Sequence, residues 1–277
     1  MRLLLLVAIL SSVAHAQDLS FRSHGKEIRS LSLAELKKLV PAKDITIFEP
    51  HEKQKVTYSA VAARAVFEAV FKDEWNEADE VLFTCADGYQ PSVPASKFKK
   101  FAAYLSFAKP NKAFSMVNSL QNSEKIELGP YYLIWDNETF PALKAEGGSD
   151  FPYQVVAIEL VNFEKRFPGM TPPRNRSPQV ERGFSAFRKN CMACHTINGD
   201  GGGKAVELNY PVNITEMVKT PWLRRWILDP TSIRYNTTMP AYNPADPKRQ
   251  QTVKDILAYL RQMRKHKRKP VPRDESP

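Results

Sequence analysis

The chain contains few cysteines and histidines, three and five in 277 residues. A structural zinc site needs four ligands, and a redox disulfide would need a C-x-x-C pair in a thioredoxin-like βαβ setting. Cys85 lies far upstream of Cys191 and Cys194, and His266 is the only histidine after His195. Neither setting is present, so the sequence argues against a zinc centre and against a redox disulfide.

Long apolar runs are absent after the first sixteen residues. Arg2, the apolar stretch Leu3–Val13 and then Ala14–Ala16 have the order of a cleavable signal peptide, so we expect the mature chain to begin at Gln17. The stretch is too short to cross a bilayer, and no cysteine follows the cleavage site to carry a lipid. We therefore predict a periplasmic protein without a transmembrane segment.

Residues 191–195 have the pattern C-x-x-C-H, which is the attachment sequence of c-type haem. On a helical turn, thiols three residues apart project from one face, so both can form thioethers with one porphyrin. The imidazole of His195 is then placed to bind the iron. We predict one covalent haem c, attached through Cys191 and Cys194, with His195 as an axial ligand.

A Pro-rich segment at residues 167–178 divides the chain. It holds four prolines and one glycine, which cannot sustain a helix or a central strand. A chain of this length with 43% hydrophobic residues is long enough for two domains on either side of it. The expected parts are a signal peptide at 1–16, domains at 17–166 and 179–265, and a basic, Pro-rich tail at 266–277.

The second half is expected to alternate helices with loops. The first helix, Ser177–Asn190, leads into the C-x-x-C-H turn, and Asn198–Gly203 then breaks the chain. A second helix is expected from Thr220 to Leu228, and Asp246 with Pro247 opens the last one.

The second axial ligand is expected between the second and third helices. Met239 lies in the segment Thr237–Tyr242, where Pro240 stiffens a loop that must hold a weak thioether ligand. Met217 and Met263 occupy helical positions that are typical of surface or core residues. We predict Met239 as the sixth ligand, and six-coordinate iron favours electron transfer over substrate binding.

Residues 177–265 resemble class I c-type cytochromes. The motifs that carry the resemblance are the helix with Gly183 and Phe187, the C-x-x-C-H turn, Met239–Pro240 and the terminal sequence Leu257–Leu260. The resemblance implies an all-α domain in which the first and last helices cross at Gly183, Phe187 and Tyr259.

The resemblance also implies contacts around the haem. Trp226 and Arg234 are the expected neighbours of the propionates. The family usually has Gly-Pro-x-Leu after the attachment site, whereas residues 204–208 contain no proline. We expect Pro211 to take over the support of His195.

The first half is expected to be an α+β domain. Ser32–Glu35 forms a capping box at the start of a short helix. Further helices are expected at residues 59–71, where Val61 belongs to the apolar face, and at residues 96–107. Strands are expected at residues 81–85, 131–135 and 154–161, which are rich in β-branched and aromatic residues.

Residues 83–90 resemble the strand and turn of the sulfite-oxidase-like, molybdopterin-binding oxidoreductase domain. Residues 129–131 and 152–156 also fit this domain. In catalytic members a cysteine at this place binds molybdenum, so the resemblance implies that role for Cys85. The alternative interpretation of Cys85 is a small buried residue at the end of a strand.

The surroundings of Cys85 favour the second interpretation. The catalytic domain of that family is usually larger and surrounds the pterin phosphate with Arg and His side chains. The corresponding window here offers Lys97, Lys99 and Lys100, on a helix face that we expect to be solvated. We therefore expect no molybdopterin.

The formal net charge of +10 makes the protein basic. An exported protein is not expected to bind nucleic acid, so ordinary solubility and docking to an acidic redox partner remain as interpretations. The basic run Arg264–Lys269 is a candidate docking segment, and its alternative is a solvated helix end.

Three functions therefore remain open. We expect a monohaem electron carrier whose N-terminal domain is a noncatalytic docking module and which has no catalytic residues of its own. The alternative is a molybdenum-dependent, sulfite-oxidase-like oxidoreductase that passes electrons from an N-terminal molybdenum site, with Cys85 as a ligand, to its own haem. The third possibility is a haem-based sensor.

Overall fold

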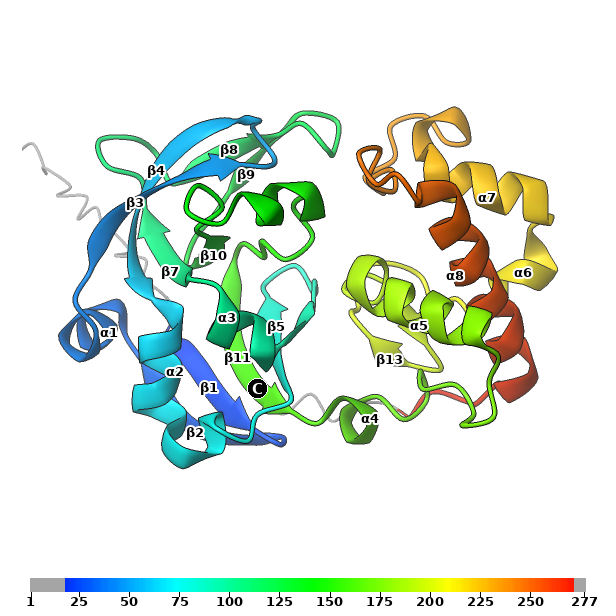
Figure 1. Ribbon diagram of the computed structural model, residues 1–277, viewed down its shortest axis with the longest axis horizontal. Helices are drawn as coiled ribbons and strands as arrows, with labels where there is room; N and C mark the ends of the chain where they lie inside the picture. The colour runs from blue at the N-terminus through cyan, green and yellow to red at the C-terminus, as the bar shows by residue number, and fades with distance from the viewer. Residues whose placement is uncertain (1–17, 272–277) are drawn as a thin grey trace, which may run out of the picture.

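The computed structural model describes residues 18–271, so the expected signal peptide at 1–16 lies outside the described residues. A β-rich N-terminal domain and a helical C-terminal domain lie beside each other, joined by α4 and the segment that follows it (Figure 1). In the part of the chain described, no helix combines the length and the apolar character needed to span a membrane.

Two sheets and a hairpin build the N-terminal domain. The five-stranded sheet has the order β2-β1-β11-β5-β6, with β1 and β11 parallel, and the four-stranded antiparallel sheet has the order β10-β7-β4-β3. Strands β8 and β9 pair with each other. The strands are β1 (Leu19–Ser23), β2 (Lys26–Leu31), β3 (Lys43–Glu49), β4 (Gln54–Ala62), β5 (Glu80–Cys85), β6 (Ser92–Pro94), β7 (Ala103–Ala108), β8 (Ser115–Asn118), β9 (Glu124–Glu127), β10 (Tyr132–Trp135) and β11 (Val155–Val161).

Short helices connect these strands, and the predicted capping box at Ser32 is present at the start of α1. Two predicted helices were wrong in part. Residues 59–62 belong to β4, where fully buried Val61 pairs with β7, and residues 103–107 lie in β7 between β10 and β4. Sheet pairing overrode local helical spacing at both places. The helices are α1 (Leu33–Leu39), α2 (Ala63–Phe71), η1 (Lys72–Trp75), α3 (Ala95–Lys100), η2 (Pro141–Glu146) and α4 (Phe163–Arg166).

A buried carboxylate lies in the core of the N-terminal domain. Glu49 is fully buried and accepts hydrogen bonds from Tyr58 (2.7 Å), Tyr132 (2.9 Å) and Nδ1 of His51 (2.8 Å). Burial acts to raise the pKa of Glu49, but the hydrogen bonds from His51 and Tyr58 outweigh it and lower this pKa below 4.5. The carboxylate therefore ties β3, β4 and β10 together.

The Pro-rich segment after α4 contains no helix or strand, yet its apolar side chains are packed. Phe167 and Met170 are fully buried in the same core cluster as α5 and α8. The Tyr259 hydroxyl donates to the Met170 carbonyl (2.7 Å). The connection between the two domains is therefore anchored in the C-terminal core.

In the C-terminal domain, α5 and α8 cross closely (Figure 1). A Cβ atom at Gly183 would lie 1.9 Å from the Asp255 carbonyl oxygen, so only glycine permits this approach. The rings of Phe187 and Tyr259 stack nearby with centroids 5.2 Å apart. The predicted crossing residues are thereby confirmed.

The remaining C-terminal elements follow the expected order. Helix α7 begins at Thr220, so Lys219 and not Thr220 occupies its N-cap position, and α8 begins three residues after Asp246, whose carboxylate accepts the N–H of Lys248 (2.8 Å). The elements are α5 (Pro178–Asn190), β12 (Thr196–Ile197), β13 (Asp200–Gly201), α6 (Ile214–Met217), α7 (Thr220–Leu228), η3 (Pro230–Ser232), α8 (Arg249–Met263) and η4 (Arg264–His266).

The substitution Glu49→Gln should destabilise the N-terminal domain by about 3 kcal/mol near neutral pH, because it breaks a buried, charge-assisted network. A carboxylate with a lowered folded-state pKa contributes stability that is present above pH 4.5 and is lost as the pH falls. Urea unfolding at a series of pH values should therefore show the difference between wild type and variant shrinking below pH 4.5. A constant difference down to the lowest pH would contradict the ionised state of Glu49.

Candidate functional site

The C-x-x-C-H turn continues directly from α5. The N–H of Cys191 donates to Phe187 of the helix (2.8 Å), and the N–H groups of Cys194 (3.1 Å) and His195 (2.9 Å) both donate to the Cys191 carbonyl. Met192 and Ala193, between the two cysteines, are buried, whereas the cysteines and the histidine are half-buried. The turn therefore fixes two intervening residues in the core and leaves the three reactive side chains together at its surface.

Both cysteines of the turn are free thiols. Burial, with a smaller contribution from the charge of Cys194, raises the pKa of Cys191 to about 12. Burial also raises the pKa of Cys194 to about 11. The donor set fits covalent haem, which needs two unpaired thiols three residues apart.

The histidine of the turn is oriented by the backbone. Nδ1 of His195 lies 2.8 Å from the Val206 carbonyl oxygen, so Nδ1 carries the proton and Nε2 remains for a metal. Burial lowers the pKa of His195, which favours the neutral imidazole that binds iron. The expectation that Pro211 supports His195 was wrong: Pro211 is exposed, and the carbonyl of Val206 supplies the support.

The hairpin of β12 and β13 directly follows the attachment turn and packs on it. Gly202, the residue after β13, is buried against the turn. A Cβ atom at Gly202 would lie 1.9 Å from the Ala193 carbonyl oxygen and 3.2 Å from the Gln90 nitrogen. At Gly203, by contrast, a Cβ atom would meet nothing within 4 Å. Only the first of these two glycines is required by packing.

Met239 lies in the long loop between η3 and α8. It is half-buried and packs on the same core cluster as Cys191 and Tyr242. Burial first, and then the hydrogen bond to Asp246, raise the pKa of Tyr242 to about 12, and the charge of Cys191 contributes to this shift. The structure therefore brings the loop of Met239 close to the attachment turn.

The other methionines and the two expected propionate neighbours lie elsewhere in the domain. Met217 is 69% exposed on α6, and Met263 is buried within α8. Trp226 is half-buried on α7, whereas Arg234 is exposed after η3. Neither Trp226 nor Arg234 forms a side-chain hydrogen bond within residues 18–271, so their predicted roles stay predictions.

Residues 180–264 match the family model for cytochrome c. The C-terminal domain is a cytochrome c domain. This identity implies covalent haem c and haem-based electron transfer. The N-terminal domain is not assigned by a family model, and no curated protein sequence matches the chain.

The N-terminal domain touches the cytochrome c domain at the attachment turn itself. The turn after β5 reaches across: the N–H of Gln90 donates to the Ala193 carbonyl (2.8 Å), and the N–H of Gly203 donates to the Gly88 carbonyl (3.1 Å). The Lys204 ammonium forms an ion pair with Asp87 beside these bonds. No sequence pattern predicts this contact, because Gln90, Gly88 and Asp87 belong to no motif and Ala193 takes part only through its backbone carbonyl.

Two further ion pairs join the domains next to the end of α5. Arg188 lies 2.5 Å from Glu80, and Lys189 lies 2.9 Å from Glu146. In each pair the cation belongs to the cytochrome c domain and the carboxylate to the N-terminal domain. The contact therefore has a consistent electrostatic polarity.

Cys85 lies under this contact. It is 2% exposed at the end of β5, and Cys194 is close enough to influence its pKa. Burial raises the pKa of the Cys85 thiol well above its ordinary value. Burial at the end of β5 agrees with the interpretation of Cys85 as a small core residue.

The lysines on α3 differ from the expected solvated face. Lys97 is largely buried and donates to Glu146 (2.9 Å) and Asp150 (2.6 Å), so its prediction as a solvated residue was wrong. Lys99 and Lys100 are exposed as expected. Among residues 18–271 no group of three or more His, Cys, Asp or Glu side chains is arranged to hold a metal ion.

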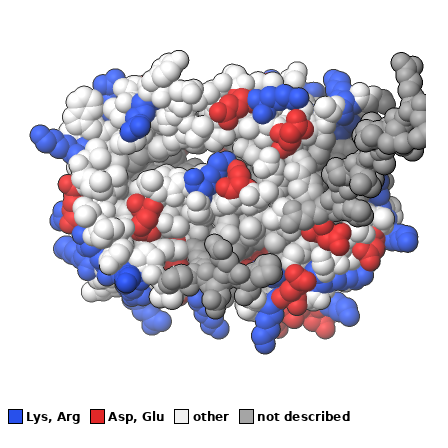
Figure 2. Space-filling model, turned by 180° about the vertical axis from the view of Figure 1, so that it is seen from behind, with Lys and Arg blue, Asp and Glu red and all other residues white. Residues whose placement is uncertain are grey.

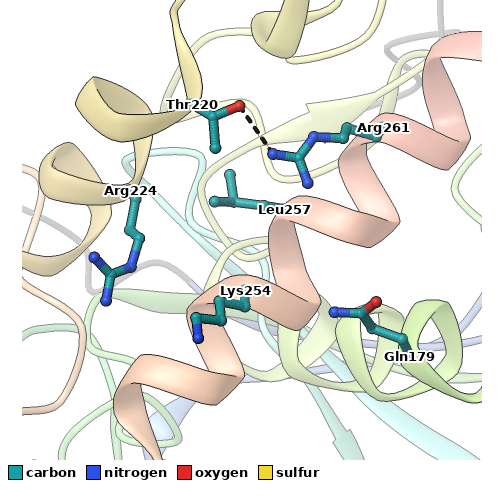
Figure 3. Close-up of a pocket in the computed structure, with 6 residues that line it drawn as sticks. All are labelled: Gln179, Thr220, Arg224, Lys254, Leu257 and Arg261. Carbon is teal, nitrogen blue, oxygen red and sulfur yellow. Dashed lines mark hydrogen bonds between the residues drawn. The ribbon is translucent and has the colours of Figure 1, made fainter.

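A cationic groove lies on the cytochrome c domain, lined by Gln179, Thr220, Arg224, Lys254, Leu257 and Arg261, with a volume of about 520 Å³ (Figure 3). Arg261 donates to the Thr220 hydroxyl (2.9 Å), and Arg224 contacts Gln250. Within the described chain, Arg224, Lys254 and Arg261 form no ion pair. Three unneutralised cations therefore surround the apolar side chain of Leu257.

The substitution Gly202→Ala should destabilise the protein by about 2 kcal/mol, because the added methyl group collides with the backbone of Ala193. It should also reduce the fraction of chains that carry covalent haem. Gly203→Ala is the matched control and should change stability by less than about 0.5 kcal/mol. Urea unfolding and the haem-to-protein ratio measure both effects, and equal behaviour of the two variants would contradict the packing argument.

Proposed function

We propose that this chain is an exported monohaem c-type cytochrome that carries single electrons between proteins. The observation that carries the proposal is the turn Cys191–His195, in which Nδ1 of His195 is bound to the Val206 carbonyl and Nε2 is left for iron. Haem attached there supplies a one-electron iron couple. The apolar run and cleavage site at residues 3–16 support export to the periplasm.

We infer that Met239 is the second axial ligand. Its half-buried side chain packs against the same core cluster that Cys191 contacts, whereas Met217 is exposed and Met263 is inside α8. A His and Met ligand pair leaves no open position for a gas or substrate. This supports an electron carrier over a haem-based sensor.

We infer that the N-terminal domain is a noncatalytic docking module with a sulfite-oxidase-like strand and turn at residues 83–90. A molybdenum ligand at Cys85 fits poorly, because this thiol is buried beneath the contact with the cytochrome c domain. The nearby cations also form ion pairs within the chain: Lys97 with Glu146 and Asp150, and Lys204 with Asp87. These cations are therefore not free to bind a pterin phosphate.

We infer that the cationic groove receives the acidic surface of a redox protein. The three cations of the groove form no ion pair with a carboxylate of the described residues. Exposed Arg264 and Lys265 follow Arg261 along the chain and extend the basic surface. On the face seen in Figure 2, cationic and acidic side chains lie interspersed, so the positive charge is not gathered into one surface there. Complementary charge steers encounter between redox partners.

The substitution Met239→Ala should abolish the weak sulfur-to-iron absorption band of the oxidised protein and lower its reduction potential, because the thioether favours reduced iron. Met217→Ala is the control and should leave both unchanged, since Met217 is exposed on α6. Optical spectra and a redox titration measure these properties. An unchanged spectrum in Met239→Ala would reject the ligand assignment.

Metal analysis of the same export-matured protein tests the noncatalytic role of the N-terminal domain. We expect iron at about one equivalent and no molybdenum. Molybdenum close to one equivalent per haem would establish the oxidoreductase alternative.

The substitution Lys254→Glu should slow electron exchange with a small acidic blue-copper protein several-fold at low ionic strength. The difference should vanish in high salt, where the screening length falls to about 3 Å. Lys26→Glu makes the same charge change on β2 of the N-terminal domain and should have little effect. Stopped-flow mixing gives the rate constants, and equal slowing in both variants would show that only net charge matters.

A further inference from the structure

The loop that carries Met239 has very few hydrogen bonds to its own domain. It is bounded by the N–H of Arg234, which donates to Pro230 (2.9 Å), and by the N–H of Tyr242, which donates to Ile227 (3.0 Å). Between these two points, residues 235–241 make no hydrogen bond to another described part of the cytochrome c domain.

The N-terminal domain supplies a hydrogen bond to this loop. Within residues 235–241 the N–H of Met239 donates to the Thr237 hydroxyl (3.3 Å), which is a local bond. The only hydrogen bond of the described chain that leaves this segment runs from Nδ2 of Asn122 to the Thr237 carbonyl (2.9 Å). Asn122 belongs to the loop between β8 and β9, which lies opposite the loop after α7 (Figure 1). The two residues are 115 positions apart in sequence.

Asn122 is presented by a loop that is itself well anchored. Asn118, just before it, is 2% exposed, and its Nδ2 donates to Gln121 (3.0 Å). The N–H of Ser119 donates to the carbonyl of buried His51 (3.0 Å). The loop that presents Asn122 is therefore anchored to the core of the N-terminal domain, while Asn122 itself is exposed.

A second bond holds the far end of the same loop. Nδ2 of Asn243 donates to the Ala145 carbonyl (3.1 Å) on η2. The neighbouring Glu146 is fixed from both sides, by Lys97 of the N-terminal domain and by Lys189 of α5. The loop of Met239 is thus attached to the N-terminal domain before and after the methionine.

We propose that the N-terminal domain positions the Met239 loop through Asn122 and the Ala145 carbonyl, and thereby sets the strength of thioether ligation. The inference rests on the proposed role of Met239 as a ligand. A loop that makes few hydrogen bonds to its own domain visits conformations in which the sulfur is displaced, and the apparent strength of a ligand scales with the fraction of time it is in place. One hydrogen bond of ordinary net strength changes such a population about fivefold. Asn122 is a positioning residue that acts through Thr237.

The test uses Asn122→Gly in the full-length, haem-loaded protein. Asn122 has a φ of 53°, which glycine adopts without strain, so the substitution removes the donor and leaves the backbone free to keep its course. Imidazole competes with the sulfur for oxidised iron, and we expect its affinity to rise about fivefold. The reduction potential should fall, because weaker thioether ligation favours oxidised iron.

Ser123→Gly is the matched control. Ser123 has a φ of 54°, and it forms no hydrogen bond with another described residue. It therefore reports the effect of adding glycine to this loop without losing the bond to Thr237. Imidazole affinity and potential should stay at their wild-type values, and urea unfolding should be alike in both variants.

The outcomes separate this inference from the ligand assignment. If Met239→Ala raises imidazole affinity and Asn122→Gly does not exceed Ser123→Gly, the positioning role is wrong and the ligand assignment stands. If Met239→Ala leaves both the spectrum and imidazole affinity unchanged, the ligand assignment is wrong and the positioning role falls with it.

Discussion

The hydrogen bond from the Gln90 N–H to the Ala193 carbonyl is the contact around which the molecule is organised. Backbone carbonyls just beyond the end of a helix have no partner within it, and buried ones must find a partner elsewhere. Here the partner comes from the other domain, because Gly202 allows a close backbone approach beside Ala193. The attachment turn is therefore completed only when the two domains are in contact.

The charges around this contact extend the same arrangement. Arg188, Lys189 and Lys204 of the cytochrome c domain meet carboxylates of the N-terminal domain. The N-terminal domain thus meets the cations of the cytochrome c domain with carboxylates of the same chain. Because the two surfaces are covalently linked, their effective concentration is high, and modest ion pairs are enough to keep them together. Cations committed in this way are not available to an external partner, whereas Arg224, Lys254 and Arg261 of the groove on α7 and α8 form no ion pair within the described residues.

The sequence was sufficient wherever chemistry depends on residues close together along the chain. The C-x-x-C-H turn, the capping box at Ser32 and the helix that begins after Ser177 are all local patterns, and each is present. Sequence reasoning was insufficient where burial depends on partners far away. Residues 103–107 lie within a sheet because β4 and β10 pair with them, and Lys97 is buried because Glu146 and Asp150 reach it from a distant loop.

The support of His195 shows the same limit within the site. A family pattern placed that support on a proline, whereas the structure uses the carbonyl of Val206, and any residue type can supply a carbonyl. Backbone acceptors leave no trace in a sequence. The same holds for the bond between Asn122 and the Thr237 carbonyl, since an asparagine in a loop is unremarkable until the fold shows what it faces.

The N-terminal domain contacts both the loop of Met239 and the attachment turn. These two segments are therefore coupled through the N-terminal domain. Linkage between two equilibria is reciprocal: if docking of the N-terminal domain strengthens ligation by Met239, then ligation strengthens docking by the same factor. Thioether ligation is stronger to reduced than to oxidised iron. If Met239 is the ligand as proposed, reduction should favour the closed arrangement of the two domains, and electron transfer should change how firmly the chain holds its own N-terminal domain.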